Sequence, residues 1–478
     1  MNKDFGGKKI AILGFGIEGQ SVADYLIGKT DNIVVLDEKN RSDFDLEVLK
    51  SYESRGIEFR WGKIADLKEF DIVFRSPGIN PASKCILDAK HNGVELTSAT
   101  KLFFDLCPCP IIGVTGTKGK GTTSTLIYEM LKESARLAAD YESRRSEDVY
   151  LGGNIGTPPL EFLDKLDKDS KVVLELSSFQ LIDLEKSPHI AVMLMTTVEH
   201  LDYHKDVYEY IEAKRNIFRH QTVDDFAVVN QDYPASNESD IEGEAPVYRV
   251  SRAREVLEDG CYVDNEEIKL KIKNEKLKII NAKDIALPGK HNLENAAAAV
   301  MVATLAGAKL DSIKHILKTF KGLPHRIEFV ATVRGVSYYD DSFSTTPETA
   351  IAAIESFSEP KILLLGGSSK NSDFTELGEA ISNSDSIKAI IGIGEEWSRI
   401  NAEIKNQPAS PDASLGGKSK IKIIEGCKNM EEVVKTAFEI GEVGDVVLLS
   451  PACASFDRYK NYKDRGEQFK EEVNRLRQ

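Results

Sequence analysis

Residues 111–123 read Ile111-Ile112-Gly113-Val114-Thr115-Gly116-Thr117-Lys118-Gly119-Lys120-Gly121-Thr122-Thr123. An apolar, β-branched run is followed by a turn of small residues and glycines, and then by a segment up to Lys132 that is compatible with a helix. Backbone amides in such a loop point inward, the start of the helix adds partial positive charge, and a lysine reaches the β- and γ-phosphates. The pattern predicts a phosphate-binding loop, with ATP as the leading ligand.

This loop departs from the strict Walker A pattern at two places. The pattern has four residues between its first glycine and Gly-Lys, whereas Gly116 precedes Gly119-Lys120 by only two residues. The position after the lysine, which normally carries the hydroxyl for Mg²⁺, is Gly121. Thr122 or Thr123 must then supply that hydroxyl, or water does. A simple glycine turn is the alternative, but a lysine at the helix start favours nucleotide binding.

The composition limits the class of protein. A length of 478 residues suggests about three domains, and a hydrophobic content of 41% supports sizeable cores. No apolar run approaches the ~20 residues of a membrane span, and no secretory leader precedes the first strand. A net charge of −15 argues against a general nucleic-acid binder, because such binding requires a basic surface. We expect a soluble, cytoplasmic monomer that binds neither membrane nor nucleic acid.

The six cysteines, at positions 85, 107, 109, 261, 427 and 453, include one close pair. No second pair or Cys/His cluster completes a zinc site. We interpret all six as reduced thiols, and Cys107-Pro108-Cys109-Pro110 as a linker.

The N-terminal segment carries a second glycine loop. Lys8–Ser21 predicts a strand, the pattern Gly14-Phe15-Gly16-Ile17-Glu18-Gly19 and a helix, and a strand at 33–37 ends in Asp37. This is the dinucleotide-type fingerprint, in which the glycines approach a diphosphate and the acid binds a ribose. A third strand, at 71–75, leads into Ser76-Pro77-Gly78, which is placed for another phosphate contact. An NAD-dependent oxidoreductase is therefore a competing hypothesis, and tight turns alone are another.

Two strand ends downstream of the phosphate loop carry candidate metal ligands. Glu175 interrupts an apolar strand, which is costly unless the carboxylate is paired or binds metal, and beside a phosphate loop a Mg²⁺ role is favoured over a simple salt bridge. The strand at 190–195 is followed by His200, Asp202 and His204, which suit a second metal position or ordinary loop hydrogen bonds. Helical residues from 208 to 219 include Lys214.

The remaining chain predicts further regular elements. Residues 268–273 alternate as a half-exposed strand does, and 296–308 form an apolar, alanine-rich helix. Near-continuous apolar strands at 361–365, 389–393 and 445–450 alternate with helical segments, which indicates a parallel sheet covered on both faces. A charged surface insertion is expected at 133–148, and a mobile loop at 408–420.

Several of these stretches, in this order, resemble the ATP-dependent Mur ligases of peptidoglycan precursor synthesis. They are the phosphate loop, Gly153-Asn154-Ile155-Gly156, Glu175-Leu176-Ser177-Ser178-Phe179-Gln180, His200-Leu201-Asp202, Ala213-Lys214, Gly289-Lys290-His291-Asn292, Pro324-His325-Arg326, Asp340-Asp341-Ser342 and Leu449-Ser450-Pro451-Ala452-Cys453-Ala454-Ser455-Phe456-Asp457. The N-terminal loop and the terminal motif resemble the branch of the family that adds D-glutamate.

The resemblance implies an α/β fold of three domains. They would be a Rossmann-like domain at 1–108 that binds the UDP of the substrate, a central P-loop ATPase domain at 109–322, and a Rossmann-like domain at 323–478 that binds the incoming amino acid and part of ATP. It reinterprets the N-terminal fingerprint as a diphosphate site without hydride chemistry. Domain closure around the ligands is expected.

The implied reaction uses ATP, Mg²⁺, UDP-N-acetylmuramoyl-L-alanine and D-glutamate. ATP phosphorylates the alanyl carboxylate, and the amine of D-glutamate then attacks the acyl phosphate. Lys120 would stabilise the developing negative charge. Glu175 and a hydroxyl of the phosphate loop, which we expect to be that of Thr122, would hold one Mg²⁺. His200 and a carbamylated Lys214 would hold or support a second.

The resemblance also assigns binding residues. The ATP set is Gly116, Thr117, Lys118, Gly119, Lys120, Gly121, Thr122, Asn292, Asn295, Arg326 and Asp341. The UDP-substrate set is Gly14, Phe15, Gly16, Asp37, Ser76, Gly78, Asn80 and Asn154. The amino-acid set is Thr345, Lys370, Ser455 and Phe456.

The chain departs from the family pattern at four positions. Lys118 replaces an asparagine, Gly121 a serine or threonine, and Phe343 a lysine, while Ser368 stands near where an acid is often found. The last two bear on the choice of amino acid. Other Mur-type ligases therefore stay open as alternatives, as does a non-catalytic ATP-binding module. Folylpolyglutamate synthase-like ligases are a further alternative, but their chains would begin at the phosphate-loop domain. The hundred or so residues that precede the phosphate loop here count against them.

Overall fold

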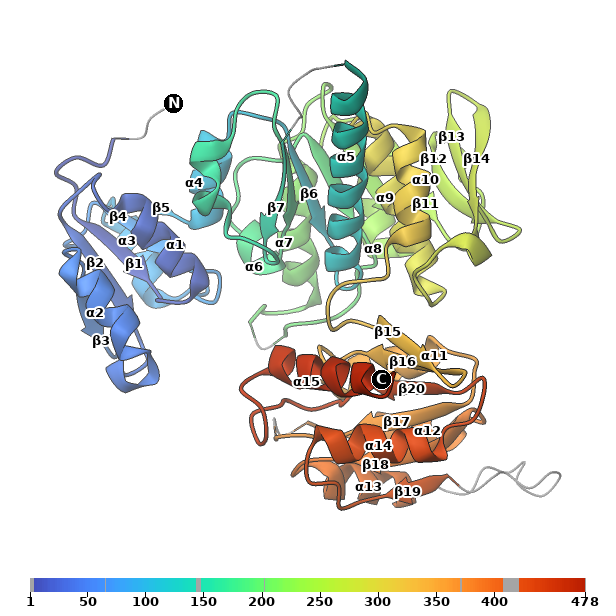
Figure 1. Cartoon of the computed structure of the whole chain (residues 1–478). Helices are drawn as coiled ribbons and strands as arrows, with labels where there is room; N and C mark the ends of the chain where they lie inside the picture. Colours follow the sequence, from blue (N-terminus) through green and yellow to red (C-terminus); the bar gives the residue numbers. More distant parts are fainter. Residues whose placement is uncertain are drawn as a thin grey trace. The chain divides into compact units, whose positions relative to one another are not determined.

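The computed structural model describes residues 4–64, 66–142, 148–201, 203–369, 372–406 and 421–477. The chain divides into two compact units. The first comprises Met1–Asp284 and Leu293–Lys318, and the second comprises Ile285–Asn292 and Thr319–Gln478. The first unit holds two β-sheets and the second holds one, and all three sheets carry helices (Figure 1). The predicted three-domain α/β fold is confirmed.

The N-terminal sheet is parallel throughout. Its order is β3-β2-β1-β4-β5, with β1 (Ile10–Leu13), β2 (Ile33–Asp37), β3 (Glu58–Trp61), β4 (Ile72–Arg75) and β5 (Glu95–Thr97). The helices are α1 (Ile17–Leu26), α2 (Leu46–Ser54), α3 (Lys84–His91) and α4 (Ala99–Leu106). A Cβ at Gly19 would lie 2.0 Å from the Gly14 carbonyl oxygen, so the close approach of α1 to β1 requires glycine.

The central sheet has nine strands in the order β14-β13-β12-β11-β10-β9-β6-β8-β7. They are β6 (Ile111–Thr115), β7 (Val149–Gly153), β8 (Lys171–Glu175), β9 (Ile190–Met193), β10 (Phe226–Asn230), β11 (Val247–Ser251), β12 (Gly260–Asp264), β13 (Glu267–Ile272) and β14 (Glu275–Asn281). Strands β6 to β12 pair in parallel, and β13 and β14 add an antiparallel margin. Because β6, β8 and β9 are parallel neighbours, their carboxyl ends share one edge.

The helices of the central part are α5 (Lys120–Glu142), α6 (Ser178–Leu181), α7 (Val207–Arg219), α8 (Pro234–Asn237), α9 (His291–Leu305) and α10 (Leu310–Thr319). In α9 every residue from Ala296 to Ala303 is fully buried, which confirms the predicted apolar helix. The predicted surface insertion at 133–148 is wrong for residues 133–142, because α5 continues through Glu142. Glu133 and Arg136 pair one turn apart and stabilise the extension. The other part of that predicted insertion includes 143–147, outside the described residues.

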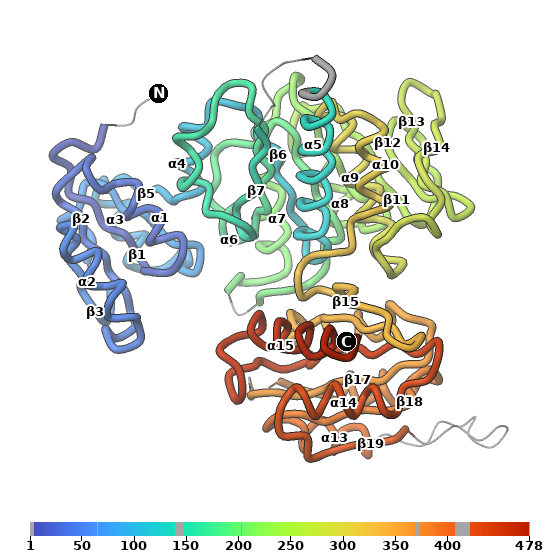
Figure 2. Tube along the Cα trace, in the orientation of Figure 1, coloured from blue at the N-terminus to red at the C-terminus, as the bar shows by residue number. Residues whose placement is uncertain are grey.

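The C-terminal sheet has the order β15-β16-β20-β17-β18-β19. Its strands are β15 (Glu328–Val333), β16 (Val336–Asp340), β17 (Lys361–Leu365), β18 (Ile387–Gly392), β19 (Lys422–Ile424) and β20 (Val446–Leu449), and only β15 pairs in the antiparallel sense among them. The helices are α11 (Pro347–Glu355), α12 (Thr375–Asn383), α13 (Trp397–Asn406), α14 (Met430–Ile440) and α15 (Tyr462–Arg475). The trace in Figure 2 shows the alternation of strand and helix. The loop expected at 408–420 lies outside the described residues.

None of the helices in the described ranges has the length and apolar character to cross a bilayer.

Candidate active site

The phosphate loop connects β6 to α5, and both neighbouring elements fix its backbone. Gly116 and Gly119 have φ values of 148° and 87°, which residues other than glycine rarely adopt. A Cβ at Gly116 would meet the Leu194 Cβ at 2.9 Å, and one at Gly119 would meet the Asn295 Oδ1 at 2.3 Å. The loop therefore lies tightly between the end of β9 and helix α9, and its glycines cannot be replaced without displacing it.

Two lysine ammonium groups converge on one carbonyl of this loop. Lys120 Nζ donates to the Gly116 and Thr117 carbonyl oxygens, each at 2.9 Å. Lys214 Nζ, from α7, donates to the same Gly116 oxygen at 2.9 Å. Like charges this close repel each other unless an anion neutralises them or one lysine loses its proton. The loop is thus built to receive negative charge.

Lys214 is the more deeply buried of the two lysines, with 1% of its surface exposed. Its Nζ lies 4.6 Å from the centre of the Tyr210 ring, one turn earlier on α7. Burial, followed by the charge of Lys120, lowers the pKa of Lys214 well below its usual value. A neutral amine at this position is a nucleophile, which is the form that reacts with carbon dioxide.

Glu175 ends β8 beside the loop and is 4% exposed. Its Oε1 accepts a hydrogen bond from Asn154 Nδ2 at 3.0 Å. Because Asn154 is neutral, it adds no positive charge beside the carboxylate, which is the kind of group that binds a hard cation such as Mg²⁺. Asn154, predicted to contact the UDP substrate, supports the predicted metal ligand in this structure.

The two candidate threonines differ in their surroundings. Thr123 is fully buried, and its hydroxyl donates to Asn295 Oδ1 at 3.5 Å, whereas Thr122 is 7% exposed. The Glu175 carboxylate and the Thr122 hydroxyl are both oxygen donors, the kind of ligand that Mg²⁺ prefers.

The histidines after β9 play different structural roles. The His200 side chain is 43% exposed, its backbone has φ 59°, and its Nε2 lies 3.7 Å from Glu199 Oε2. The His204 side chain is buried, stacks on Phe179, and contacts Ser178 Oγ at 2.9 Å through Nε2. His204 thus packs in the core, which disfavours the proposed metal role. Asp202 lies outside the described residues.

Lys118, which stands where the family pattern has an asparagine, forms an ion pair in this structure. Its Nζ donates to Glu199 Oε1 at 2.8 Å, so the lysine ties the phosphate loop to the segment after β9. Thr117 adds a second tie, because its hydroxyl contacts the Tyr210 hydroxyl at 2.9 Å and accepts from the Thr197 amide at 3.0 Å. Sequence reasoning missed Tyr210, although it lies four residues before Lys214 on the same helical face.

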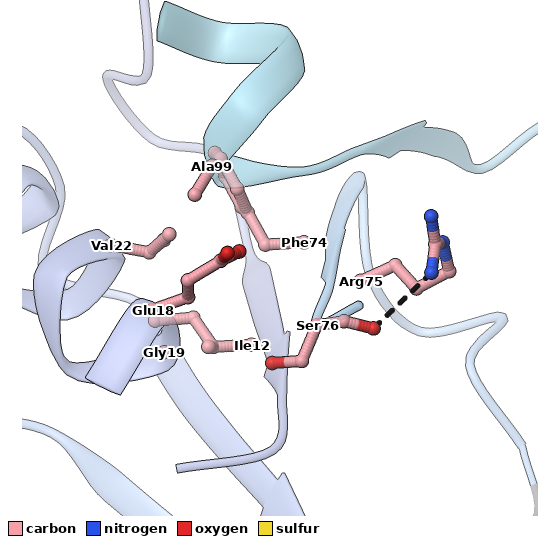
Figure 3. A pocket seen from close by; sticks show the side chains of 8 residues that line it. All are labelled: Ile12, Glu18, Gly19, Val22, Phe74, Arg75, Ser76 and Ala99. Atoms are coloured by element: carbon pink, nitrogen blue, oxygen red, sulfur yellow. Dashed lines mark hydrogen bonds between the residues drawn. The ribbon is translucent and has the colours of Figure 1, made fainter. Parts of the chain in front are cut away.

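The N-terminal glycine loop lies beside a small hollow lined by Ile12, Glu18, Gly19, Val22, Phe74, Arg75, Ser76 and Ala99 (Figure 3). Ser76 Oγ donates to the Gly14 carbonyl at 3.4 Å, so the structure brings these two predicted residues together. Asp37 accepts from the Phe15 amide at 2.7 Å and so holds the loop. Gly16 and Gly78 are exposed beside these residues.

Arg75 joins the N-terminal sheet to the central part of the first unit. Its guanidinium is 3% exposed and donates to Asp183 at 2.7 Å and to the Phe179 carbonyl at 3.2 Å. Asn80 adds a bond from Nδ2 to the Tyr203 carbonyl at 2.9 Å. Sequence reasoning missed the role of Arg75, because Asp183 and Phe179 lie about a hundred residues away from it.

The second unit holds the remaining candidates. Arg326 stacks its guanidinium over Phe343, 4.5 Å from the ring centre, and Asn292 Nδ2 donates to the Pro288 carbonyl at 2.6 Å. Asp341 accepts from the Ile327 amide at 3.1 Å and from Ser450 Oγ at 2.7 Å, and burial raises its pKa to about 7. Its carboxylate is thus already engaged by the protein.

The residues predicted to bind the incoming amino acid differ in solvent exposure. Phe456 is 72% exposed and its amide donates to Ser368 Oγ at 3.0 Å, while Ser455 is buried and Thr345 half-buried. Lys370 lies outside the described residues.

One His/carboxylate group in the described part of the second unit was not predicted as a metal site. His325, Glu328 and Asp340 have ligand atoms within 4.8 Å of one another. His325 Nδ1 contacts Asp340 Oδ2 at 2.7 Å, and Lys470 Nζ lies 3.2 Å from Glu328 Oε2. Because a lysine already supplies a cation, this cluster is explained without a metal.

Comparison with known proteins gives matches along the chain. Three family models match in order: a Mur ligase MurD-like N-terminal domain over residues 8–98, a Mur ligase middle domain over 114–303, and a Mur ligase glutamate ligase domain over 325–453.

Curated relatives match over their full length. The UDP-N-acetylmuramoylalanine–D-glutamate ligase of Acetivibrio thermocellus is 38% identical over 476 residues, which cover 99% of this chain and 98% of that protein. The ligase of the same name from Clostridioides difficile is 38% identical over 479 residues, covering 99% and 100%.

Solved structures agree on the fold. MurF ligase from Thermotoga maritima, in complex with ADP, gives a TM-score of 0.54 at 20% identity, over 93% of this chain and 95% of that one. UDP-N-acetylmuramate-alanine ligase MurC from the same organism gives 0.53 at 19%, over 98% and 99%. At such identities the likeness supports the fold alone.

Proposed function

The chain belongs to the Mur ligase family, and from this premise we propose that it joins D-glutamate to UDP-N-acetylmuramoyl-L-alanine at the expense of ATP, in peptidoglycan precursor synthesis. It is an ATP-dependent ligase. The observation that carries the proposal is the convergence of Lys120 and Lys214 on the Gly116 carbonyl, beside Glu175. This arrangement suits a reaction in which each step builds negative charge.

In the proposed mechanism Lys120 leaves the loop carbonyls and donates to the phosphates of ATP. The ammonium stabilises charge as the phosphoryl group passes to the alanyl carboxylate, and the amine of D-glutamate then displaces phosphate from the acyl phosphate. Mg²⁺, held by Glu175 and the Thr122 hydroxyl, would supply further neutralisation of the phosphate oxygens.

Lys214 has a separate proposed role. Its amine, kept neutral by burial, adds to carbon dioxide and releases one proton, which gives a carbamate. The product is an anionic oxygen group next to Lys120, and its negative charge attracts the Lys120 ammonium. His200, on the segment after β9, is proposed to support this group.

The substrate sites are proposed from the family resemblance. The contact of Ser76 with Gly14 supports a diphosphate site at the N-terminal loop, with Phe15, Gly16, Asp37, Gly78 and Asn80 around it. Asn292, Asn295, Arg326 and Asp341 are proposed for ATP, and Thr345, Lys370, Ser455 and Phe456 for D-glutamate. We further propose a cytoplasmic monomer with domain boundaries near residues 108 and 322.

Phosphate release tests the activity. The purified protein, with ATP, Mg²⁺ and UDP-N-acetylmuramoyl-L-alanine, is offered D-glutamate, L-glutamate, L-alanine or diaminopimelate, and the product is weighed by mass spectrometry. We expect release only with D-glutamate, and a product heavier by one glutamyl unit. Release with another amino acid would refute the D-glutamate assignment. Turnover of NAD without ATP would refute the ligase.

A matched pair of lysines on α5 provides the control. Lys120→Ala should abolish phosphate release, because the loop loses the charge that meets the phosphates. Lys132→Ala removes an exposed lysine from the same helix and should leave the rate unchanged. Equal rates in the two variants would contradict the proposed role of Lys120.

A further inference from the structure

Two cysteine thiols lie together in the connection between α4 and β6. Helix α4 ends at Leu106, Cys107 follows in an extended conformation (φ −61°, ψ 122°), and β6 begins at Ile111. The two sulfur atoms, Cys107 Sγ and Cys109 Sγ, are 3.6 Å apart, and Cys107 Sγ also donates to the Cys109 carbonyl at 3.4 Å. A disulfide needs about 2.05 Å, so the two sulfur atoms have to approach each other by about 1.5 Å to form a bond.

The two thiols have unequal surroundings. Cys107 is half-buried, whereas Cys109 is 9% exposed and belongs to the hydrophobic core of the first unit. The hydrogen bond between the thiols lowers the pKa of Cys107 and raises that of Cys109. The accessible sulfur is therefore the one favoured as thiolate, and the inner sulfur keeps its proton.

The other cysteines lack this arrangement within the described part of the chain. Cys85 and Cys427 contact hydroxyl groups, those of Ser83 and Thr436, rather than a thiol. Cys261 is fully buried, and burial raises the pKa of Cys453 to about 12. These four residues serve as internal controls for any thiol chemistry.

We propose that Cys107 and Cys109 form a reversible disulfide by exchange with a small-molecule disulfide. The Cys107 thiolate attacks one sulfur of that molecule, forms a mixed disulfide and expels the first small thiolate. Cys109 then gives its proton to the departing thiolate, attacks Cys107 Sγ and expels the second small thiolate, which takes up from water the proton that Cys107 had lost. The two cysteines are oxidised by two electrons, and the small disulfide is reduced to two thiols.

The geometry makes this bond easy to reverse. The ring closed by the disulfide spans only Cys107, Pro108 and Cys109, so it removes little entropy from the unfolded chain. A disulfide with little stabilisation and a partly accessible sulfur is of the labile kind. The bond would lie in the segment that joins the N-terminal sheet to the strand leading into the phosphate loop.

The test uses the full-length protein, oxidised glutathione as the probe, and alkylation with N-ethylmaleimide followed by peptide mass spectrometry. We expect the peptide with both cysteines to be lighter by two hydrogen atoms and to lose both alkylation sites. Dithiothreitol should restore them, while Cys85 and Cys427 stay alkylatable throughout. Full alkylation of both thiols after the glutathione treatment would overturn the proposal.

Two serine variants separate the roles. Cys109→Ser should stop at a stable mixed disulfide between Cys107 and glutathione, and Cys107→Ser should leave Cys109 largely unmodified. In the wild type Cys107 should react with the maleimide about tenfold faster than Cys85. Equal mixed-disulfide yields at the two positions would refute the assigned order of attack. Circular dichroism confirms that each variant is folded.

Discussion

Lys214 in the first unit and Arg465 in the second are both deeply buried basic side chains, but their surroundings differ. Lys214 in the first unit is 1% exposed and donates one hydrogen bond, to the Gly116 carbonyl. Arg465 in the second unit is fully buried and donates to Ser342 Oγ, the Ser342 carbonyl, and the carbonyls of Ala454 and Cys453, at 2.9–3.1 Å. Burial lowers the pKa of Arg465 to about 10, so it stays charged at neutral pH.

The difference lies in the number of acceptors around each cation. Arg465 donates four hydrogen bonds to oxygen atoms, so its charge is stabilised in place, and the side chain acts as a clamp between the segment after β16, the segment after β20 and α15. Lys214 meets one acceptor and a neighbouring cation, so its neutral form is favoured. A buried basic group whose hydrogen bonds are all made stabilises the fold, whereas one with few acceptors is available for chemistry.

The largest expected effect comes from breaking the clamp. Arg465→Ala should lower the free energy of unfolding of the second unit by about 5 kcal/mol, because several charge-assisted hydrogen bonds and buried volume are lost. Arg475→Ala, exposed on the same helix, should change it by less than about 0.5 kcal/mol. Urea unfolding followed by Trp397 fluorescence, in a Trp61→Phe background, reports on this unit. Equal midpoints for the two variants would contradict the clamp.

The second effect removes the reactive amine. Lys214→Ala should slow phosphate release about a thousandfold, about 4 kcal/mol, while leaving the protein as stable as before. Short-chain carboxylates such as acetate should restore part of the rate, because they can replace the carbamate. Lys214→Arg, which cannot form a carbamate, should be inactive. If carboxylates do not restore the rate of Lys214→Ala, the proposed carbamate on Lys214 is contradicted.

The third effect concerns pH. Asp341, beside Ser342 of the clamp, has a pKa raised to about 7 by burial, above its unfolded value. The folded state therefore keeps the proton between pH 4 and 7 while the unfolded state loses it, so the stability that this group contributes is fully present below pH 4 and declines as pH rises to 7. The decline attributable to this group is about 4 kcal/mol. Asp341→Asn should abolish it in urea titrations; an unchanged pH slope would show that another group is responsible.

The smallest effect lies in the phosphate loop. Thr122→Ala should raise the Mg²⁺ concentration needed for half-maximal phosphate release about tenfold, because the hydroxyl proposed to bind the metal is lost. Thr123→Ala should change it less, since the Thr123 hydroxyl is buried and directed to Asn295. Equal shifts would mean that neither hydroxyl is a specific ligand.

Much of the fold could be predicted because it follows local patterns. The apolar runs at 10–13, 111–115 and 361–365 are strands in the structure, and the alanine-rich segment is a helix. The burial of Lys214 was not predicted from the residues alone, which favoured a solvent-facing lysine, although Tyr210 and Phe218 lie four residues before and after it on one helical face. The clamp could not be predicted, because Arg465 meets Ser342, which is more than a hundred residues away. The pairing of Asn154 with Glu175 likewise depends on how β7 and β8 lie in the sheet.

The antiparallel margin of the central sheet has a consequence for assembly. Strand β14 lies at the end of the strand order, and its first four residues, Glu275–Lys278, are exposed. Lys276 pairs with Glu255, and Lys278 with Glu267. A strand from another molecule that added to this edge would have to strip water from these charges. These charges thereby oppose edge-to-edge aggregation at the β14 edge of the central sheet.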